Sequence, residues 1–193
     1  MQLSQDAITQ AAMNILRQYG LADVSMRRLA TSLGVAPGAL YWHIESKQEL
    51  ISNMAAEIVR PVLEHGAPGD PAELSALLRR SLLSVRDGAE VAVAAIGQPG
   101  TALRGKLVDA FAAAVAGWVG GTRRASASEQ LAAANGLLHL TLGAASVEQS
   151  GAQLAAATGS ETAAELSPVE AEAQHRTAVQ LLLRGLGAVG EGV

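Results

Sequence analysis

The chain has 193 residues, of which 49% are hydrophobic and only 3% aromatic, and it carries no cysteine and a formal net charge of −4. The lack of cysteine excludes a disulfide scaffold, a thiol nucleophile and a cysteine-ligated zinc site, and no apolar stretch has the length of a membrane span. We therefore expect a soluble, cytoplasmic protein with a helical core of Ala, Leu and Val, because Ala and Leu are strong helix formers.

The first two predicted helices are short and clearly bounded. Apolar side chains between residues 8 and 19 follow the i, i+3, i+4, i+7 pattern of an amphipathic helix. Gly20 suits the position just after its end. Ser25 is the expected N-cap of a second helix, which Gly34 ends.

A third and a fourth helix follow at once. Pro37 suits the first turn of a helix that reaches Trp42. Ser46 and Glu49 have the spacing of a capping box, in which each side chain bonds the other residue's backbone. They predict a long fourth helix that extends to about Glu64.

The rest of the chain repeats this alternation of apolar helices with Gly, Pro and Ser. A connecting segment, 150–166, is rich in Ala, Gly, Ser and Thr and is expected to be a mobile link with a turn of helix. The predicted fold class is all-α, with about nine or ten helices and no strand. The remaining helices are expected at about 70–87, 88–96, 102–119, 126–148 and 168–187.

Residues 24–50 carry the functional signal, because two short helices joined at 34–36 have the form of a helix-turn-helix. The third helix is too short to bury both Tyr41 and Trp42, so at least one of them must face outward. Exposed aromatics near Lys47 suit contacts with DNA phosphates. The alternative is that both aromatics belong to the core of a helical bundle.

The negative net charge does not exclude DNA binding. Residues 61–193 carry nine basic and thirteen acidic side chains, whereas residues 1–60 carry five of each. The acidic excess therefore lies entirely outside the helix-turn-helix segment, and a local basic face is compatible with binding to DNA.

Residues 8–51 resemble the N-terminal domain of the TetR family of transcriptional regulators. Trp42 and His43 bring the chain near the tetracycline repressor subgroup of that family. The positions that carry the resemblance are Ile8, Ala11, Ala12, Leu16, Gly20, Ser25–Ala30, Leu33–Val35, Ala39–His43, Lys47 and Leu50.

The resemblance implies that the third helix is the recognition helix and that Lys47 contacts a phosphate. One departure is that 36–38 offers no amide or hydroxyl side chain for reading bases, so base readout rests more on Arg27, apolar contacts and DNA shape. The DNA contacts implied are Arg27, Pro37, Gly38, Ala39, Tyr41, Trp42, His43 and Lys47.

Segments 86–91 and 139–143 also resemble the tetracycline repressor subgroup, which grips a magnesium–drug chelate. Ala92 and Val147 stand where the subgroup has its histidine and glutamate ligands. We therefore expect no metal site and a small, largely apolar effector. The expected pocket residues are Leu63, Leu74, Leu78, Leu82, Arg86, Ala92, Gln98, Trp118, His139 and Thr141.

Several of these residues have simpler interpretations. His139 is equally well a hydrogen-bonded histidine in or beside the core, and Trp118 equally well fills the core. Arg86 beside Asp87 is more typical of a local salt bridge or a helix-end charge. The two other histidines of the second part, His65 and His175, are expected to be solvated.

The sequence thus predicts a repressor with a helix-turn-helix DNA-binding domain at 1–46 and a helical effector-binding and dimerisation domain at 47–193. The resemblance implies a homodimer, paired through helices at about 126–148 and 168–187, that binds a palindromic double-stranded operator and is released by a small-molecule effector. No cofactor is expected. The alternatives are a ligand-binding helical protein or an enzyme without DNA binding, but no catalytic set of residues is present in the sequence.

Overall fold

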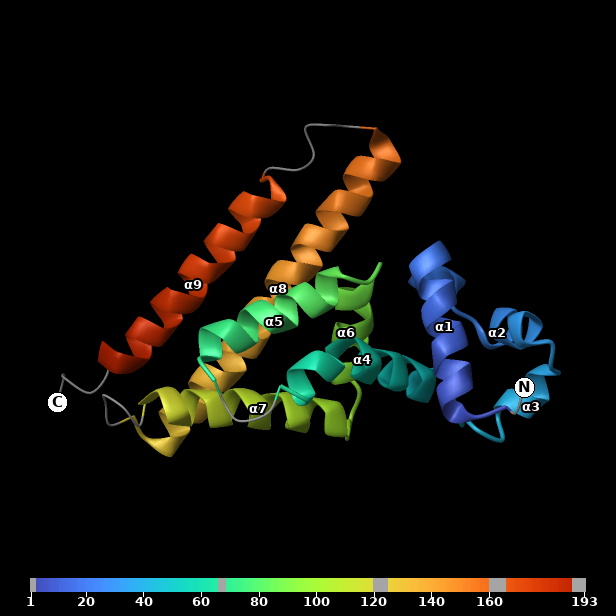
Figure 1. Cartoon of the computed structure of the whole chain (residues 1–193), viewed down its shortest axis with the longest axis horizontal. Helices are drawn as coiled ribbons and strands as arrows, with labels where there is room; N and C mark the ends of the chain where they lie inside the picture. The colour runs from blue at the N-terminus through green and yellow to red at the C-terminus, as the bar shows by residue number, and fades with distance from the viewer. Residues whose placement is uncertain (1–2, 66–68, 120–124, 160–165, 189–193) are drawn as a thin grey trace. The chain divides into compact units, whose positions relative to one another are not determined.

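The computed structural model describes residues 3–65, 69–119, 125–159 and 166–188, and within these ranges every regular element is a helix (Figure 1). The predicted all-α class is confirmed. The elements are α1 (Gln5–Tyr19), a 3-10 helix (Leu21–Asp23), α2 (Met26–Leu33), α3 (Pro37–Leu40), α4 (Lys47–Leu63), α5 (Pro71–Leu83), α6 (Gly88–Ile96), α7 (Ala102–Val119), α8 (Ala127–Thr158) and α9 (Pro168–Ala188).

The helix ends near the N-terminus follow the predicted capping. Ser25 accepts a hydrogen bond from the Arg28 backbone N–H at 3.2 Å and so caps α2. Gly20 ends α1 with a φ of +92°, and Gly34 ends α2 in the left-handed conformation with a φ of +67°. Both glycines adopt backbone angles that other residues reach only with strain.

Capping boxes start the later helices. Ser126 caps α8 and Ser167 caps α9, each accepting from the backbone N–H of a glutamate three residues on, at 3.3 Å. Glu129 and Glu170 accept hydrogen bonds in return from the serine hydroxyl and backbone N–H, which lowers the pKa of both carboxyls.

Two predicted boundaries were wrong. α8 continues to Thr158, although 150–166 was expected to be a link; the Ala-rich stretch after Gly151 favours helix strongly enough to extend it. Residues 160–165 lie outside the described part. α3 ends at Leu40 instead of reaching Trp42. The turn that follows is closed by the N–H groups of His43 and Ile44, which donate to the Leu40 carbonyl at 3.0 and 2.9 Å.

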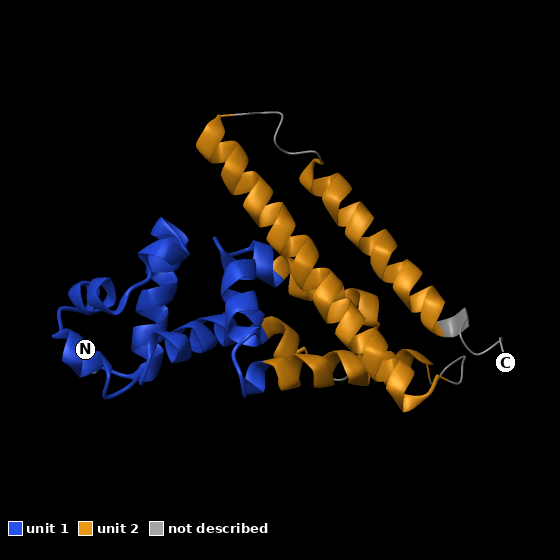
Figure 2. Cartoon of the chain, turned by 180° about the vertical axis from the view of Figure 1, so that it is seen from behind, with its two compact units in different colours: residues 1–60, 81–103 blue, residues 61–80, 104–193 orange. Residues whose placement is uncertain are grey.

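The chain divides into two compact units, shown in Figure 2. Unit 1 comprises residues 1–60 and 81–103, and unit 2 comprises 61–80 and 104–193. This contact-based division is not the functional boundary predicted after residue 46, which stays a prediction.

In unit 1, α2 packs against both α1 and α3. The fully buried side chains that hold these three helices and α4 together include Ile8, Leu16, Leu29, Leu40, Ile44, Leu50 and Met54.

In unit 2, the two longest helices, α8 and α9, lie side by side and run antiparallel (Figures 1 and 2). Gly136 allows their close approach, since a Cβ at this position would lie 3.1 Å from Leu182 Cδ1. Within the described ranges, no helix combines the length and apolarity that a membrane crossing requires.

Candidate nucleic-acid interface

A few buried side chains hold the helix-turn-helix of unit 1 in place. Leu29 and Leu40 are fully buried, and Ala30, at 1% exposure, allows the two helices to meet closely. The Val35 N–H donates to the Ala30 carbonyl at 3.0 Å and ties the turn to α2. The turn and α3 are therefore held by packing and backbone bonds, which leaves their outer side chains free for other contacts.

The segment after α3 exposes its aromatic side chains. Leu40 and Ile44 are fully buried, and between them Trp42 is 88% and Tyr41 52% exposed. The sequence predicted that at least one aromatic faces outward, and both do. His43 is also exposed.

The other predicted DNA-contact residues lie at or near the surface. Lys47, the first residue of α4, is exposed, as is Arg27 in the first turn of α2. Pro37 and Gly38 are exposed, and Ala39 is half-buried. Their contact with DNA remains a prediction, but none of these side chains is sealed in the core.

Arg28, next to Arg27, has a structural role that sequence reasoning missed. Its guanidinium forms an ion pair with Asp23 and lies 3.9 Å from the ring centroid of Tyr19. A cation over an aromatic face is attracted by the ring electrons. Arg28 thus fixes the end of α1 to α2.

A buried carboxylate joins the same region to the start of α6. Asp87 is 8% exposed and accepts a hydrogen bond from the Leu21 N–H at 2.6 Å. A Cβ on Gly20 would lie only 2.8 Å from this carboxylate, so the contact requires glycine. Arg86, a predicted pocket residue, is exposed, and its Nη1 lies 3.5 Å from the Gln18 carbonyl oxygen as a donor.

The remaining predicted pocket residues divide between the two units, so the pocket itself stays a prediction. Leu74, Leu78, Leu82, Ala92 and Thr141 are buried, whereas Leu63, Gln98 and Trp118 are half-buried.

Gln98 and His139, two further residues of the expected pocket, differ in their surroundings. Gln98 bridges to α4, accepting from the Ser52 hydroxyl at 3.1 Å and donating to the Gln48 carbonyl at 3.2 Å. His139 is exposed, because one residue after the buried Leu138 turns the side chain by about 100° around α8.

Unit 2 contains a buried polar cluster that the sequence did not predict. His175, which was expected to be solvated, is only 6% exposed, and its Nε2 lies 3.4 Å from Ser75 Oγ and 3.3 Å from Thr141 Oγ1. Arg79, also 6% exposed, forms an ion pair with Glu148. Burial and the nearby Arg79 cation lower the pKa of His175.

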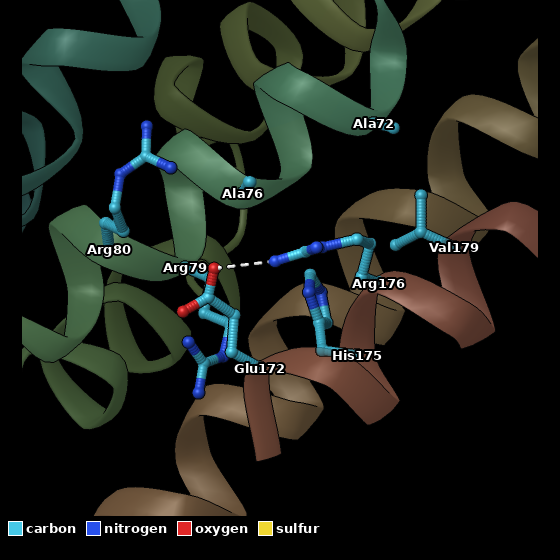
Figure 3. Close-up of a pocket in the computed structure, with 8 residues that line it drawn as sticks. All are labelled: Ala72, Ala76, Arg79, Arg80, Glu172, His175, Arg176 and Val179. Atoms are coloured by element: carbon cyan, nitrogen blue, oxygen red, sulfur yellow. Dashed lines mark hydrogen bonds and ion pairs between the residues drawn. The ribbon is translucent and has the colours of Figure 1, made fainter. Parts of the chain in front are cut away.

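A hollow between α5 and α9 adjoins this cluster, and Arg79 and His175 belong to both (Figure 3). The dashed line in the figure marks the ion pair between Arg176 and Glu172, which are 3.2 Å apart. The lining residues are Ala72, Ala76, Arg79, Arg80, Glu172, His175, Arg176 and Val179. Nowhere in the described ranges do three or more His, Asp or Glu side chains gather as metal ligands would.

The described ranges are helical and contain a helix-turn-helix with an exposed aromatic segment, which is typical of helix-turn-helix transcriptional regulators. Residues 8–54 match the family model described as bacterial regulatory proteins, tetR family. The chain is also 33% identical over 96 residues to the class C tetracycline repressor protein of Escherichia coli, a match that covers 46% of this chain and 44% of that repressor. The chain thus matches less than half the length of this curated relative.

Solved structures extend the similarity to the whole chain. The crystal structure of Mycobacterium smegmatis BioQ is 34% identical, with a TM-score of 0.81, and the comparison covers 97% of this chain and 99% of that one. BioQ crystallised with its double-stranded DNA operator is 32% identical, with a TM-score of 0.77 and the same coverage. This chain belongs to the TetR family, whose members are DNA-binding regulators and not enzymes.

Proposed function

We propose that the protein is a repressor that binds a palindromic operator as a homodimer, through Arg27 and the segment 37–47, and that a small, largely apolar effector releases it. The observation that carries the DNA contact is the exposure of Trp42 and Tyr41 beside Lys47 in a helix-turn-helix. The operator-bound structure of the similar BioQ supports it.

The chemistry of these side chains fits a DNA backbone and groove. A tyrosine hydroxyl and a lysine ammonium bind phosphates and fix the register, while Arg27 can bond a guanine edge in two places. In a two-fold symmetric dimer, the two recognition segments meet successive major grooves about 34–36 Å apart. A palindromic operator follows from that symmetry.

Selection of binding sites from random duplexes, followed by fluorescence anisotropy on the enriched sequence, tests this function. We expect a palindrome with half-sites about one helical turn apart, bound more weakly as salt rises, because phosphate contacts release counterions. Failure to enrich any sequence, or binding that is independent of DNA sequence at every salt concentration, would contradict the proposal.

We place the dimer contact on exposed apolar side chains of α8 and α9. Val147 is 75% and Leu154 60% exposed, and seven residues apart they lie within about 20° on one face of α8. Leu181 of α9 is 62% exposed. Isolated apolar residues of this kind are ordinary, but an aligned pair beside open glycines at 143 and 151 suits a close helix partner.

Other small residues of α8 serve packing within the chain. Gly136 faces Leu182, and Ala134 is fully buried. Leu183 is likewise 4% exposed. The dimer helices stay as proposed, but the contacting face is the one that carries Val147.

The double substitution Val147→Glu/Leu154→Glu is expected to yield a monomer, because it buries four like charges across a two-fold interface. Light scattering coupled to size-exclusion chromatography measures the mass. Val93→Glu is the matched control, since Val93 is 46% exposed on α6, which is not one of the proposed dimer helices. A double variant that keeps the mass of a dimer would contradict the proposed surface.

The effector proposal rests on residue type. Ala92 stands where the tetracycline repressor subgroup has a metal ligand, and Leu63 and Leu74 are apolar members of the expected pocket. An apolar lining favours an apolar ligand. Such an effector would release DNA only through a higher affinity for a conformation that does not fit the operator.

A further inference from the structure

The hollow between α5 and α9 is lined by five charged or titratable side chains and three small apolar ones. Arg79 and His175 lie at its base, each 6% exposed, and Ala72, Ala76 and Val179 line its sides. A buried charged group that keeps an unpartnered atom requires a physical explanation, and Arg79 Nε has no hydrogen-bond partner among the described residues.

We assign the tautomer of His175 from the hydroxyl contacts around it. Thr141 donates its only hydrogen to the Leu137 carbonyl at 2.8 Å, so Ser75 is the donor in the 2.6 Å contact between the two hydroxyls. Both hydroxyl oxygens are then acceptors toward His175 Nε2. Nε2 therefore carries the hydrogen of the neutral ring, and Nδ1 keeps its lone pair.

The hollow is lined by more positively than negatively charged side chains. Three guanidinium groups line it, from Arg79 and Arg80 of α5 and Arg176 of α9, against the single lining carboxylate of Glu172. Glu148 of α8, which does not line the hollow, forms an ion pair with Arg79. Arg80 and Arg176 are both exposed at the rim, so an incoming anion meets the charge of Arg80 and competes with Glu172 for Arg176.

We propose that this hollow binds the carboxylate of a small organic acid, with a short apolar chain against Ala72, Ala76 and Val179, and that His175 takes up one proton from solvent as the anion binds. The protonated Nδ1–H then donates to the carboxylate, together with the rim guanidinium groups. This site shares Thr141 with the expected effector pocket, but it takes an anion instead of an apolar ligand and does not depend on DNA binding.

The electrostatics of His175 agree with this coupling. Burial and Arg79 lower its pKa, against the smaller effects of Glu148 and Glu172, so the ring is neutral in the empty site near pH 7. A bound carboxylate favours the charged ring and raises its pKa. By linkage, the anion binds more tightly as the pH falls.

The site is compatible with the proposed dimer. Arg176 and Leu181 are five residues apart in α9, which separates their side chains by about 140° around the helix. The dimer face that carries Leu181 therefore lies away from the rim of the hollow.

Isothermal titration calorimetry of the full chain with sodium butanoate, at pH 6.0, 7.0 and 8.0 and constant ionic strength, tests the proposal. We expect saturable binding that is about tenfold weaker at pH 8.0 than at pH 6.0. Buffers of different ionisation enthalpy should show uptake of about one proton per anion. Butanamide, which has the same shape without the charge, should not bind.

Substitutions test whether the residues of the hollow bind butanoate. Arg176→Gln and Arg80→Gln, both at the surface, should each weaken butanoate binding several-fold, whereas Arg184→Gln, an exposed cation of α9 outside the hollow, should not. His175→Gln keeps a donor toward the two hydroxyls and should remove the pH dependence. No saturable binding at pH 6.0, or binding that Arg176→Gln and His175→Gln leave unchanged, would overturn the site.

Discussion

The double substitution Tyr41→Ala/Lys47→Ala is expected to weaken binding to the selected operator roughly 100-fold or more without unfolding the protein. Both side chains are exposed, Tyr41 by 52%, so their removal leaves no cavity in the core. The effect on the free energy of unfolding should therefore stay within about 0.5 kcal/mol.

The expected loss has two parts. Removal of Lys47 from both protomers takes away two phosphate contacts, which should lower the slope of log affinity against log salt by about 2. Removal of Tyr41 takes away a contact that fixes the register of the recognition segment. The single substitution Arg27→Ala should instead relax the preference for one base pair, at about 1–3 kcal/mol.

The matched control is Arg184→Ala, which removes an exposed cation from α9 in unit 2. It should leave both the affinity and the salt slope unchanged. Thermal melting of each variant separates lost contact from lost fold. Full operator affinity in the Tyr41→Ala/Lys47→Ala protein would place the DNA surface elsewhere on the molecule.

Much of unit 1 was predictable from the sequence because its signals are local. A cap such as Ser25 and a left-handed glycine such as Gly34 act within four residues, and the structure has both where they were expected. The exposure of at least one of the two aromatics, Tyr41 and Trp42, was likewise predicted, and the structure exposes both.

The polar cluster of unit 2 could not be predicted, because its members are far apart in the chain. Ser75 and His175 are 100 residues apart, and each is one of several polar residues in its helix, so nothing local marks the pair. Their contact depends on which faces of α5, α8 and α9 meet. The same unknown explains His139, which was expected in a pocket but lies one position off the buried face of α8.

The substitution Glu148→Leu is expected to lower the free energy of unfolding by about 3 kcal/mol, the low end for breaking a buried ion pair. It leaves the Arg79 guanidinium, whose side chain is 7% exposed, without its carboxylate in a site where Nε is already unpartnered. Glu148 itself is 26% exposed, so some water reaches the pair and limits the effect. Urea unfolding at a fixed protein concentration measures the change.

The double substitution Arg79→Met/Glu148→Leu decides between a lost ion pair and lost packing. If the penalty comes from an uncompensated buried charge, an apolar pair of similar volume should recover stability to within about 1 kcal/mol of the parent, because no charge is then left to desolvate. If the double variant is as unstable as Glu148→Leu alone, the loss arises from packing around α8. A Glu148→Leu protein as stable as the parent would show that Arg79 finds a second carboxylate, and Glu172, which lines the same hollow, is the candidate.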